Sequence, residues 1–180
     1  MKTLQNVTIG VFGFFLLMLG FSSPVFSQDD PQYTDPEIAS IAVTANQIDV
    51  NYADIALKKS ENENIRRFAQ TMKDDHNAVI KMAVDLATKL GVTPADNDFT
   101  QSLLKGEKEM TKKLKKASKA EFDKIYIDNE VAYHEAVINA VKSILIPQTD
   151  NAELKELLVK VAPTLQTHLE HAQMVQKEYQ

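Results

Sequence analysis

Apolar residues recur at intervals of three and four from residue 38 to residue 175, which is the spacing of amphipathic α-helices. The first helix, expected over 36–59, has the seam Ile38, Ile41, Ala45, Ile48, Tyr52 and Ile55. The same spacing predicts three more long helices, over 63–90, over 119–146 and from 151 onward. A weaker, lysine-rich amphipathic segment lies between them, at about 97–116. No segment alternates with a period of two over a useful length, so the pattern predicts an all-α protein.

Residues that start or end helices support these boundaries. Gly91 stands where the second helix should end, because glycine readily adopts the left-handed conformation found after many helices. Ser118 with Glu121 three residues later forms a capping-box pattern at the start of the 119–146 helix. Pro147 should close that helix, and Asp150 can cap the last one.

The lengths of the connections predict the topology. The first two long helices, and likewise the last two, are joined by about three to six residues, which favours two antiparallel hairpins. Between the hairpins lie roughly 28 residues, whose amphipathic part would cover nearly ~30 Å at about 1.5 Å per residue. One long crossover between two hairpins is the ferritin-like four-helix arrangement. A simple up-down bundle with an additional helix is the alternative.

The amino terminus has the pattern of a secretory signal peptide. Lys2 is the only charge before Asp29, and an apolar run from Val7 to Phe21 follows it. Compact residues then precede Ser27, after which we expect cleavage. The alternative is a retained membrane anchor, for which the run is short. The expected organisation is a signal peptide over 1–27, a linker over 28–36 and a bundle over 37–178.

Composition narrows the function further. Without residues 1–27, which include Lys2, the 153 remaining residues hold 19 basic and 25 acidic side chains, a net charge of −6. This balance argues against a dedicated nucleic-acid-binding protein. The chain has no cysteine, which excludes disulfides, thiolate metal ligands and a lipid-modified terminal cysteine. No second apolar run is long enough to cross a membrane, so no transmembrane segment is expected after cleavage.

Several polar residues interrupt the apolar seams or flank them near the middle of the predicted helices. Burying a charge without a partner is costly, so these positions require an explanation. In the crossover topology they would lie at roughly one level of the bundle, where imidazoles and carboxylates could hold iron, manganese, zinc or copper. The candidate metal ligands are Asp49, Asp75, His76, Glu130, His134, His168 and His171.

Two other interpretations of these residues stay open. The histidines could form a buried hydrogen-bonded network that fixes helix register without any metal. A di-metal redox centre would need Glu-x-x-His motifs, but the residues three before His76, His134 and His168 are Lys73, Val131 and Leu165. The di-iron pattern is therefore absent, and no catalytic residue is assigned.

Lysines form a stripe along the predicted crossover helix. Such a stripe is usually a solvated face, and the alternative is contact with an anionic partner such as lipid head groups or a cell-wall polymer. Its members are Lys105, Lys108, Lys112, Lys113, Lys115, Lys116 and Lys119.

Three motifs resemble those of the bacterial envelope family called domain of unknown function 4142. They are the runs Phe68–His76, Glu121–Tyr126 followed by His134, and Pro163–Leu169, so the resemblance covers about residues 36–178. It implies a ferritin-like bundle in the periplasm or associated with the outer membrane, and it implies no activity. It places His76, His134, His168, Asp75 and Pro163 on family-pattern positions, while His171 and Asp49 are less regular.

The sequence thus supports two main hypotheses. In the first, the protein is a non-enzymatic metal-binding bundle in which His76, His134 and His168 are ligands. Glu130 or Asp75 would then be a ligand or would orient one. In the second, it is a metal-free structural or interaction module of the cell envelope.

Overall fold

The computed structural model describes residues 31–180, and the predicted signal peptide lies outside the described residues. The described residues form helices and no strand, which confirms the all-α prediction. Four long helices and one shorter one are joined by brief connections. They are α1 (Asp35–Lys59), α2 (Glu63–Leu90), α3 (Asp98–Lys116), α4 (Lys119–Ala140) and α6 (Ala152–Gln176). Three short elements complete the fold: a π-helix (Val141–Leu145), α5 (Ile146–Gln148) and a 3₁₀ turn (Lys177–Tyr179).

The helix termini follow local chemistry closely. The predicted capping box at α4 is present, with the Ser118 hydroxyl donating to a Glu121 carboxylate oxygen at 2.6 Å. Gly91 ends α2 with φ 65°, as predicted. At α6 the cap is Asn151, whose Oδ1 accepts from the backbone of Glu153 and Leu154. Asp150 was the wrong choice by one residue, because an Asn side chain caps equally well.

The end of α4 also differs from the prediction, because Pro147 does not stop the helix. The chain stays helical to Gln148 by widening into the π-helix, where the Ile146 N–H donates to the Val141 carbonyl. Proline crowds the carbonyl four residues earlier, and a π-type turn changes which groups pair in that stretch. The widened turn places Val141 and Leu145, both buried, toward the interior.

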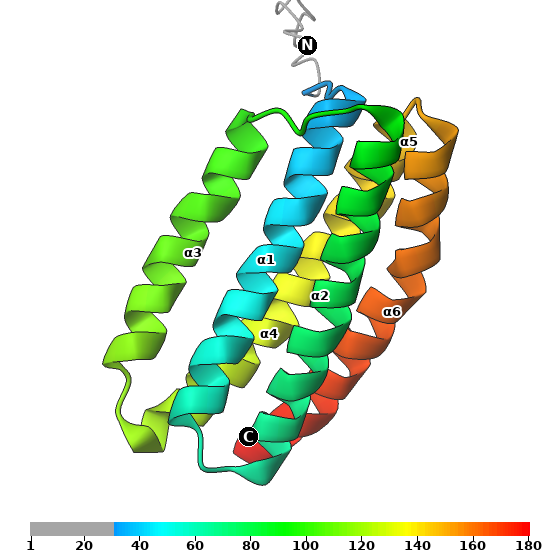
Figure 1. The fold of residues 1–180 in the computed structure, drawn as a ribbon. Coiled ribbons are helices and arrows are strands. Elements are labelled where there is room, and N and C mark those ends of the chain that lie inside the picture. The colour runs from blue at the N-terminus through cyan, green and yellow to red at the C-terminus, as the bar shows by residue number, and fades with distance from the viewer. Residues whose placement is uncertain (1–30) are drawn as a thin grey trace, which may run out of the picture. The chain divides into compact units, whose positions relative to one another are not determined.

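Two antiparallel hairpins build the bundle (Figure 1). One is α1 with α2, and the other is α4 with α6. Between them in the chain, α3 runs the length of the bundle beside α1, so that α4 begins at the same end as α2 and runs parallel to it. No helix in residues 31–180 is long and apolar enough to cross a membrane.

The core divides into two clusters, one toward each end of the bundle. We call the first the aromatic half, because it contains the buried rings of Tyr52, Phe68, Phe122 and Tyr126. It lies toward the α1–α2 turn. The second, the aliphatic half, is built from Ile, Leu and Val side chains toward α5, and its buried members are Ile38, Ile41, Ile138, Val141, Leu145, Leu154, Leu158, Leu165 and Leu169. The candidate ligands lie between the two halves.

Candidate metal centre

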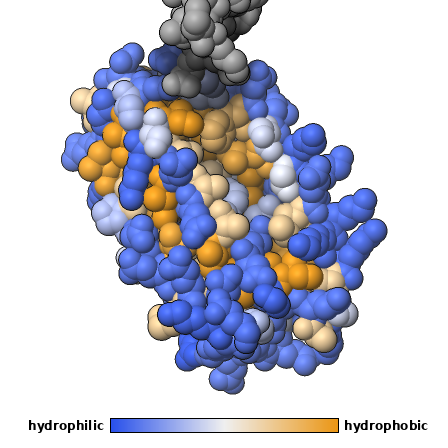
Figure 2. Space-filling view, turned by 180° about the vertical axis from the view of Figure 1, so that it is seen from behind, coloured by the Kyte–Doolittle hydropathy of each residue, from blue (hydrophilic) through white to orange (hydrophobic). Residues whose placement is uncertain are grey.

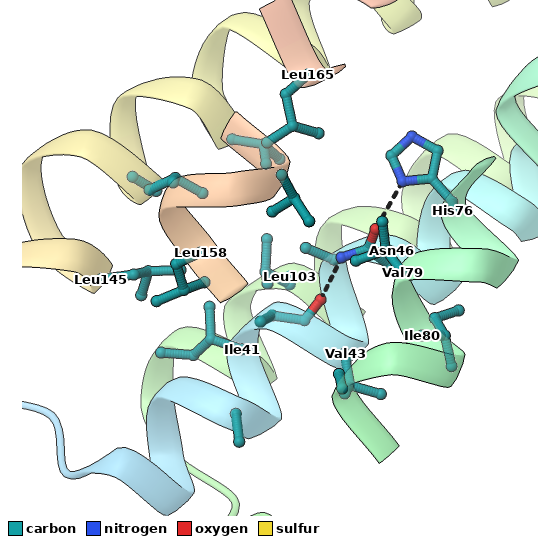
Figure 3. A pocket seen from close by; sticks show the side chains of 18 of the residues that line it. Ile41, Val43, Asn46, His76, Val79, Ile80, Leu103, Leu145, Leu158 and Leu165 are labelled. Atoms are coloured by element: carbon teal, nitrogen blue, oxygen red, sulfur yellow. Dashed lines mark hydrogen bonds between the residues drawn. The ribbon is translucent and has the colours of Figure 1, made fainter. Parts of the chain in front are cut away.

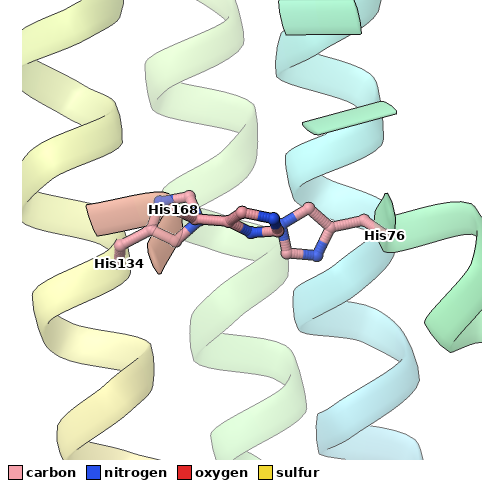
Figure 4. A group of neighbouring side chains, drawn as sticks. All are labelled: His76, His134 and His168. Atoms are coloured by element: carbon pink, nitrogen blue, oxygen red, sulfur yellow. The ribbon is translucent and has the colours of Figure 1, made fainter. Parts of the chain in front are cut away.

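Four candidate residues meet at mid-height, one from each long helix of the two hairpins. They are Asp49 of α1, His76 of α2, His134 of α4 and His168 of α6, none more than 4% exposed. The ring centroids of His76 and His168 are 5.1 Å apart, those of His134 and His168 5.6 Å, and those of His76 and His134 5.7 Å. Figure 4 shows the three imidazole rings reaching toward one another. The topology therefore brings together residues that are up to 119 positions apart in the chain.

The ring of His76 is held by Asn46 of α1. Nδ1 of His76 lies 2.7 Å from Oδ1 of Asn46, whose amide group in turn donates to the Ala42 carbonyl at 2.8 Å (Figure 3). The second hydrogen bond fixes which end of the amide faces the ring, so Asn46 offers an acceptor and Nδ1 carries the proton. Nε2 of His76 is then left with its lone pair free.

The other two rings are held in the same manner by different acceptors. Nδ1 of His134 donates to the Glu130 backbone carbonyl at 2.9 Å, and Nε2 of His168 donates to a carboxylate oxygen of Asp75 at 2.9 Å. A histidine whose second nitrogen donates to a carbonyl or carboxylate has a fixed tautomer and a fixed ring orientation, which is the usual arrangement behind a metal-bound imidazole.

The remaining ring nitrogens are buried and converge. Nε2 of His76, Nε2 of His134 and Nδ1 of His168 have no hydrogen-bond partner. Oδ2 of Asp49 lies 3.3 Å from Nε2 of His76 and 3.5 Å from Nε2 of His134. Tetrahedral coordination with bonds of about 2.0–2.1 Å requires ligand atoms roughly 3.3–3.4 Å apart. These separations are close to that spacing.

A second carboxyl group adjoins this cluster. Asp49, Glu130 and His134 each offer a ligand atom within 4.8 Å of the others, and so do His76, His134 and His168. The Glu130 side chain is fully buried, and its carboxylate oxygens have no hydrogen-bond partner. Both groups include His134. Its Nδ1 already donates to the Glu130 carbonyl, so Nε2 is the one nitrogen of His134 that can bind a metal ion in either group.

Burial sets the charge of the cluster. It raises the pKa of the Asp49 and Glu130 carboxyls, and for Glu130 the neighbouring Asp49 charge raises it further. It lowers the pKa of His76 well below its ordinary value and that of His134 to about 4. The His76 and His134 imidazoles are therefore neutral at neutral pH, which is the form that binds metal ions.

The comparisons with known proteins place the chain in a family. The profile of the family described as domain of unknown function (DUF4142) matches residues 22–175, most of the chain. This protein belongs to the DUF4142 family. A search of curated proteins finds no match.

Among solved structures, the DUF4142 chain is similar to one titled "CopM in the Cu(II)-bound form". The TM-score is 0.63 at 15% sequence identity, and the match covers 83% of this chain and 100% of the other. At this identity the likeness concerns the fold alone.

The structure separates the seven predicted site residues of this DUF4142 chain. Asp49, His76, Glu130, His134 and His168 come together in the interior. Asp75 lies outside them, with 47% of its side chain exposed, and reaches the cluster only through His168. His171 is in neither group, because its ring packs edge-on against Phe68 with 5.1 Å between centroids.

Sequence reasoning missed Asn46. It lies three residues before Asp49, on the flank of the α1 seam, where an amide is usually taken for a surface residue. In the sequence, Asn46 is only a polar residue about one turn before Asp49. Its role becomes apparent from the contact with His76 of α2, which the pattern of a single helix does not reveal.

Proposed function

We propose that this DUF4142 protein is an exported, ferritin-like helical bundle of the cell envelope that binds one divalent transition-metal ion. The ligands in this proposal are His76, His134, His168 and Asp49. One observation carries it: three buried imidazole nitrogens without partners face one another, while the opposite nitrogen of each ring is held by an acceptor.

A metal-free network accounts poorly for this arrangement. A neutral imidazole has one N–H, which His76 directs to Asn46 and His134 to the Glu130 carbonyl. The free nitrogens of His76 and His134 are therefore both acceptors, and the Asp49 carboxyl beside them, whose pKa is raised to about 8, has one proton to donate and can satisfy only one of them. A buried polar atom left without a partner costs about 1–3 kcal/mol. A cation satisfies all of them at once.

The donor set favours copper or zinc. Imidazole suits Zn, Cu, Fe and Ni, and among divalent ions Cu(II) binds most tightly to a given nitrogen and oxygen site. The structural neighbour is titled as a Cu(II)-bound protein, which agrees with that order. We therefore propose Cu(II) as the preferred ion, with Zn(II) next.

The site is proposed to hold its ion rather than to catalyse a reaction on it. Three histidines and one aspartate supply four ligands, which is a complete tetrahedral set, whereas catalytic zinc sites keep one position open. Glu130 would lie beside Asp49 without binding the ion. Asn46 and Asp75 would fix the orientation of the His76 and His168 rings, respectively. The ferritin-like character rests on the α3 crossover between two hairpins.

The test is thermal unfolding of the metal-stripped chain 28–180, alone and with Cu(II) or Zn(II). A ligand at about 100 times its dissociation constant adds roughly 2.7 kcal/mol, which should raise the Tm by about 5–10 °C. His134→Ala should abolish that shift. His171→Ala is the matched control, because it removes a histidine outside the cluster and should keep the shift.

Two results would contradict the proposal. If neither ion raises the Tm, the histidines form a metal-free network and the protein is a structural or interaction module. If His134→Ala keeps the full shift, the metal is bound elsewhere on the chain.

Export is a separate part of the proposal, supported by the apolar run at the amino terminus. We expect the exported protein to begin at Gln28. Amino-terminal sequencing of the protein recovered from the envelope checks this, and an intact Met1 would show that cleavage does not occur.

A further inference from the structure

A cavity of about 370 Å³ lies mainly in the aliphatic half of the bundle and extends to Tyr52 and Met110 of the aromatic half. Its walls come from α1, α2, α3, α4 and α6, and most of them are Ala, Val, Ile and Leu side chains (Figure 3). The inner end reaches His76 and His168, and the other end lies among Leu145 and Leu154 near α5. Ligand-binding cavities commonly measure about 300–1,000 Å³ and are mostly apolar. The volume and lining of this one are those of a binding site.

The cavity is elongated along the bundle axis. On α2 its lining extends from His76 to Leu90, which at about 1.5 Å per residue is roughly 21 Å. The hydrocarbon core of a bilayer is about 30 Å thick, so one acyl chain of a leaflet spans about 15 Å. A single extended acyl chain therefore fits the length of the cavity.

The cavity opens to solvent between α3 and α4. Ser102 and Gly106 of α3 and Ala136 of α4 are exposed, yet all three line it. A side chain at Gly106 would meet nothing within 4 Å, so open space adjoins that position. Figure 2 shows hydrophobic side chains gathered on this rear face of the molecule, between hydrophilic margins.

One flank of α3 beside the opening carries a net positive charge, because its lysines outnumber the single Glu109 there; no lysine of residues 31–180 lines the cavity itself, whereas Glu107 does. At about 100° per residue, four lysines fall on the flank of α3 that continues from Ser102 and Gly106 away from α1. They are Lys105, Lys112, Lys113 and Lys116, and none makes a salt bridge with another residue of the described chain. The facing flank of α4 carries uncharged residues, Ala132, Asn139 and Ser143.

We infer that this cavity binds a free fatty acid, with its acyl chain in the aliphatic half and its carboxylate beside the α3 lysines. The apolar walls account for the chain and the unpaired lysines for the anionic head. Burial of the methylenes supplies the affinity, and the lysines fix the direction in which the chain enters. The inference rests on the apolar walls and the α3 lysines and goes beyond the proposed metal binding, although the inner end of the cavity reaches two of the proposed ligands, His76 and His168.

The first experiment is titration of chain 28–180 with a fluorescent fatty acid, followed by displacement with palmitate. We expect saturable binding of one molecule per chain. Gly106→Trp places a large ring in the opening and should weaken binding at least 10-fold. Leu104→Trp is the matched control, since Leu104 is an exposed residue of α3 that does not line the cavity, and it should bind as the unaltered chain does.

Both tryptophan variants should keep the Cu(II)-induced rise in Tm, because neither position touches the metal cluster. A failure of the fatty-acid site is thus distinguishable from a failure of the metal site. Absence of saturable binding, or equal binding by Gly106→Trp and Leu104→Trp, would overturn the inference.

The lysines are tested by replacing all four with serine. We expect several-fold weaker binding of palmitate and unchanged binding of hexadecanol, which has the same chain without the charge. Equal effects on both compounds would overturn the assignment of the carboxylate to the lysines. Binding to anionic lipid vesicles without uptake of palmitate would show that α3 contacts a membrane surface only, and would also overturn the inference.

Discussion

The two halves of the bundle contain similar amounts of apolar sequence but pack differently. On α2, the residues Ile65, Phe68, Ala69 and Met72 are completely buried, whereas no residue of α2 after His76 is buried. The difference begins at the metal cluster, although the hydrophobic pattern continues unchanged through Val79, Met82 and Leu86. An apolar seam therefore shows which way a helix faces and does not show how closely it is packed.

Side-chain size explains much of the difference. In the aromatic half, large rings fill the space between helices, with Phe68 and Phe122 each about 6 Å from Tyr126. In the aliphatic half, Ala83 and Ala87 of α2 line the cavity at positions that a larger residue could fill. Protein interiors are normally close-packed, so a space of about 370 Å³ marks this half as the part that can accept a ligand.

The largest difference in stability between the halves is expected when one apolar side chain in each is truncated to alanine. Phe68→Ala removes a fully buried ring and should lower the free energy of unfolding by about 3–5 kcal/mol. Ile80→Ala removes a half-buried side chain that already borders the cavity and should cost less than about 1.5 kcal/mol. Urea unfolding measures both, and equal losses would mean that the two halves are packed alike.

Replacing an alanine by leucine in each half, on the same face of α2, tests the same difference in packing. Ala69→Leu inserts volume where nothing is exposed and should cost about 1–3 kcal/mol. Ala83→Leu adds the same volume at the cavity and should change stability by about +0.5 to +1 kcal/mol. Thermal unfolding of both variants decides, and a destabilised Ala83→Leu would argue that the cavity is not free to be filled.

The cluster between the halves depends on residues that touch no metal. Asn46→Ala frees the His76 ring and should weaken Cu(II) affinity by about 10–100-fold. A competition titration with a chelator measures the change. Asn51→Ala is the control, because that α1 amide donates to Glu107 and lies outside the cluster, and a similar loss in both variants would exclude a specific role for Asn46.

The metal-free protein should depend on pH in a defined direction. Burial raises the pKa of Asp49 from 3.8 to about 8, so its contribution to stability is present at low pH and is lost as pH rises toward 8. Burial lowers the pKa of His134 from 6.5 to about 4, so its contribution is complete above pH 6.5 and is lost as pH falls toward 4.

Above pH 6.5 the contribution of His134 is complete, whereas those of the buried Asp49 and Glu130 carboxyls still change. We therefore expect the free energy of unfolding to fall between about pH 6.5 and 8, by at most about 1.4 kcal/mol per pH unit for one group. Urea unfolding of the metal-free chain across this range checks it, and Asp49→Asn should reduce the slope, leaving the part that Glu130 contributes. Stability that rises with pH there would contradict a buried, protonated carboxyl.

Much of the fold and part of the site could be predicted from the sequence. The three-and-four spacing and the caps at Ser118 and Gly91 determine the helices, because both act within one or two turns. The mid-helix positions of His76, His134 and His168 were visible for the same reason. His134 and His168 are polar residues in apolar seams, whereas His76 lies on the flank of a seam in which the pattern places Asp75.

The rest depended on contacts between helices. The hydrogen bond from His76 to Asn46 joins two helices. The hydrophobic pattern does not determine the rotation of each helix about its axis precisely enough to predict which residues meet. The exclusion of His171 follows from its packing on Phe68, since it lies only three residues from His168. The cavity could not be predicted, because Val79 and Leu86 face inward in the pattern whether or not another side chain packs against them.

The central claim is that His76, His134, His168 and Asp49 hold one metal ion. The most direct test is anomalous diffraction from crystals of chain 28–180 grown with Cu(II) and measured at the copper edge. We expect one strong peak at mid-bundle, about 2.0–2.1 Å from Nε2 of His76, Nε2 of His134 and Nδ1 of His168. A well-ordered cluster with no peak there, or copper bound only at the surface, would contradict it.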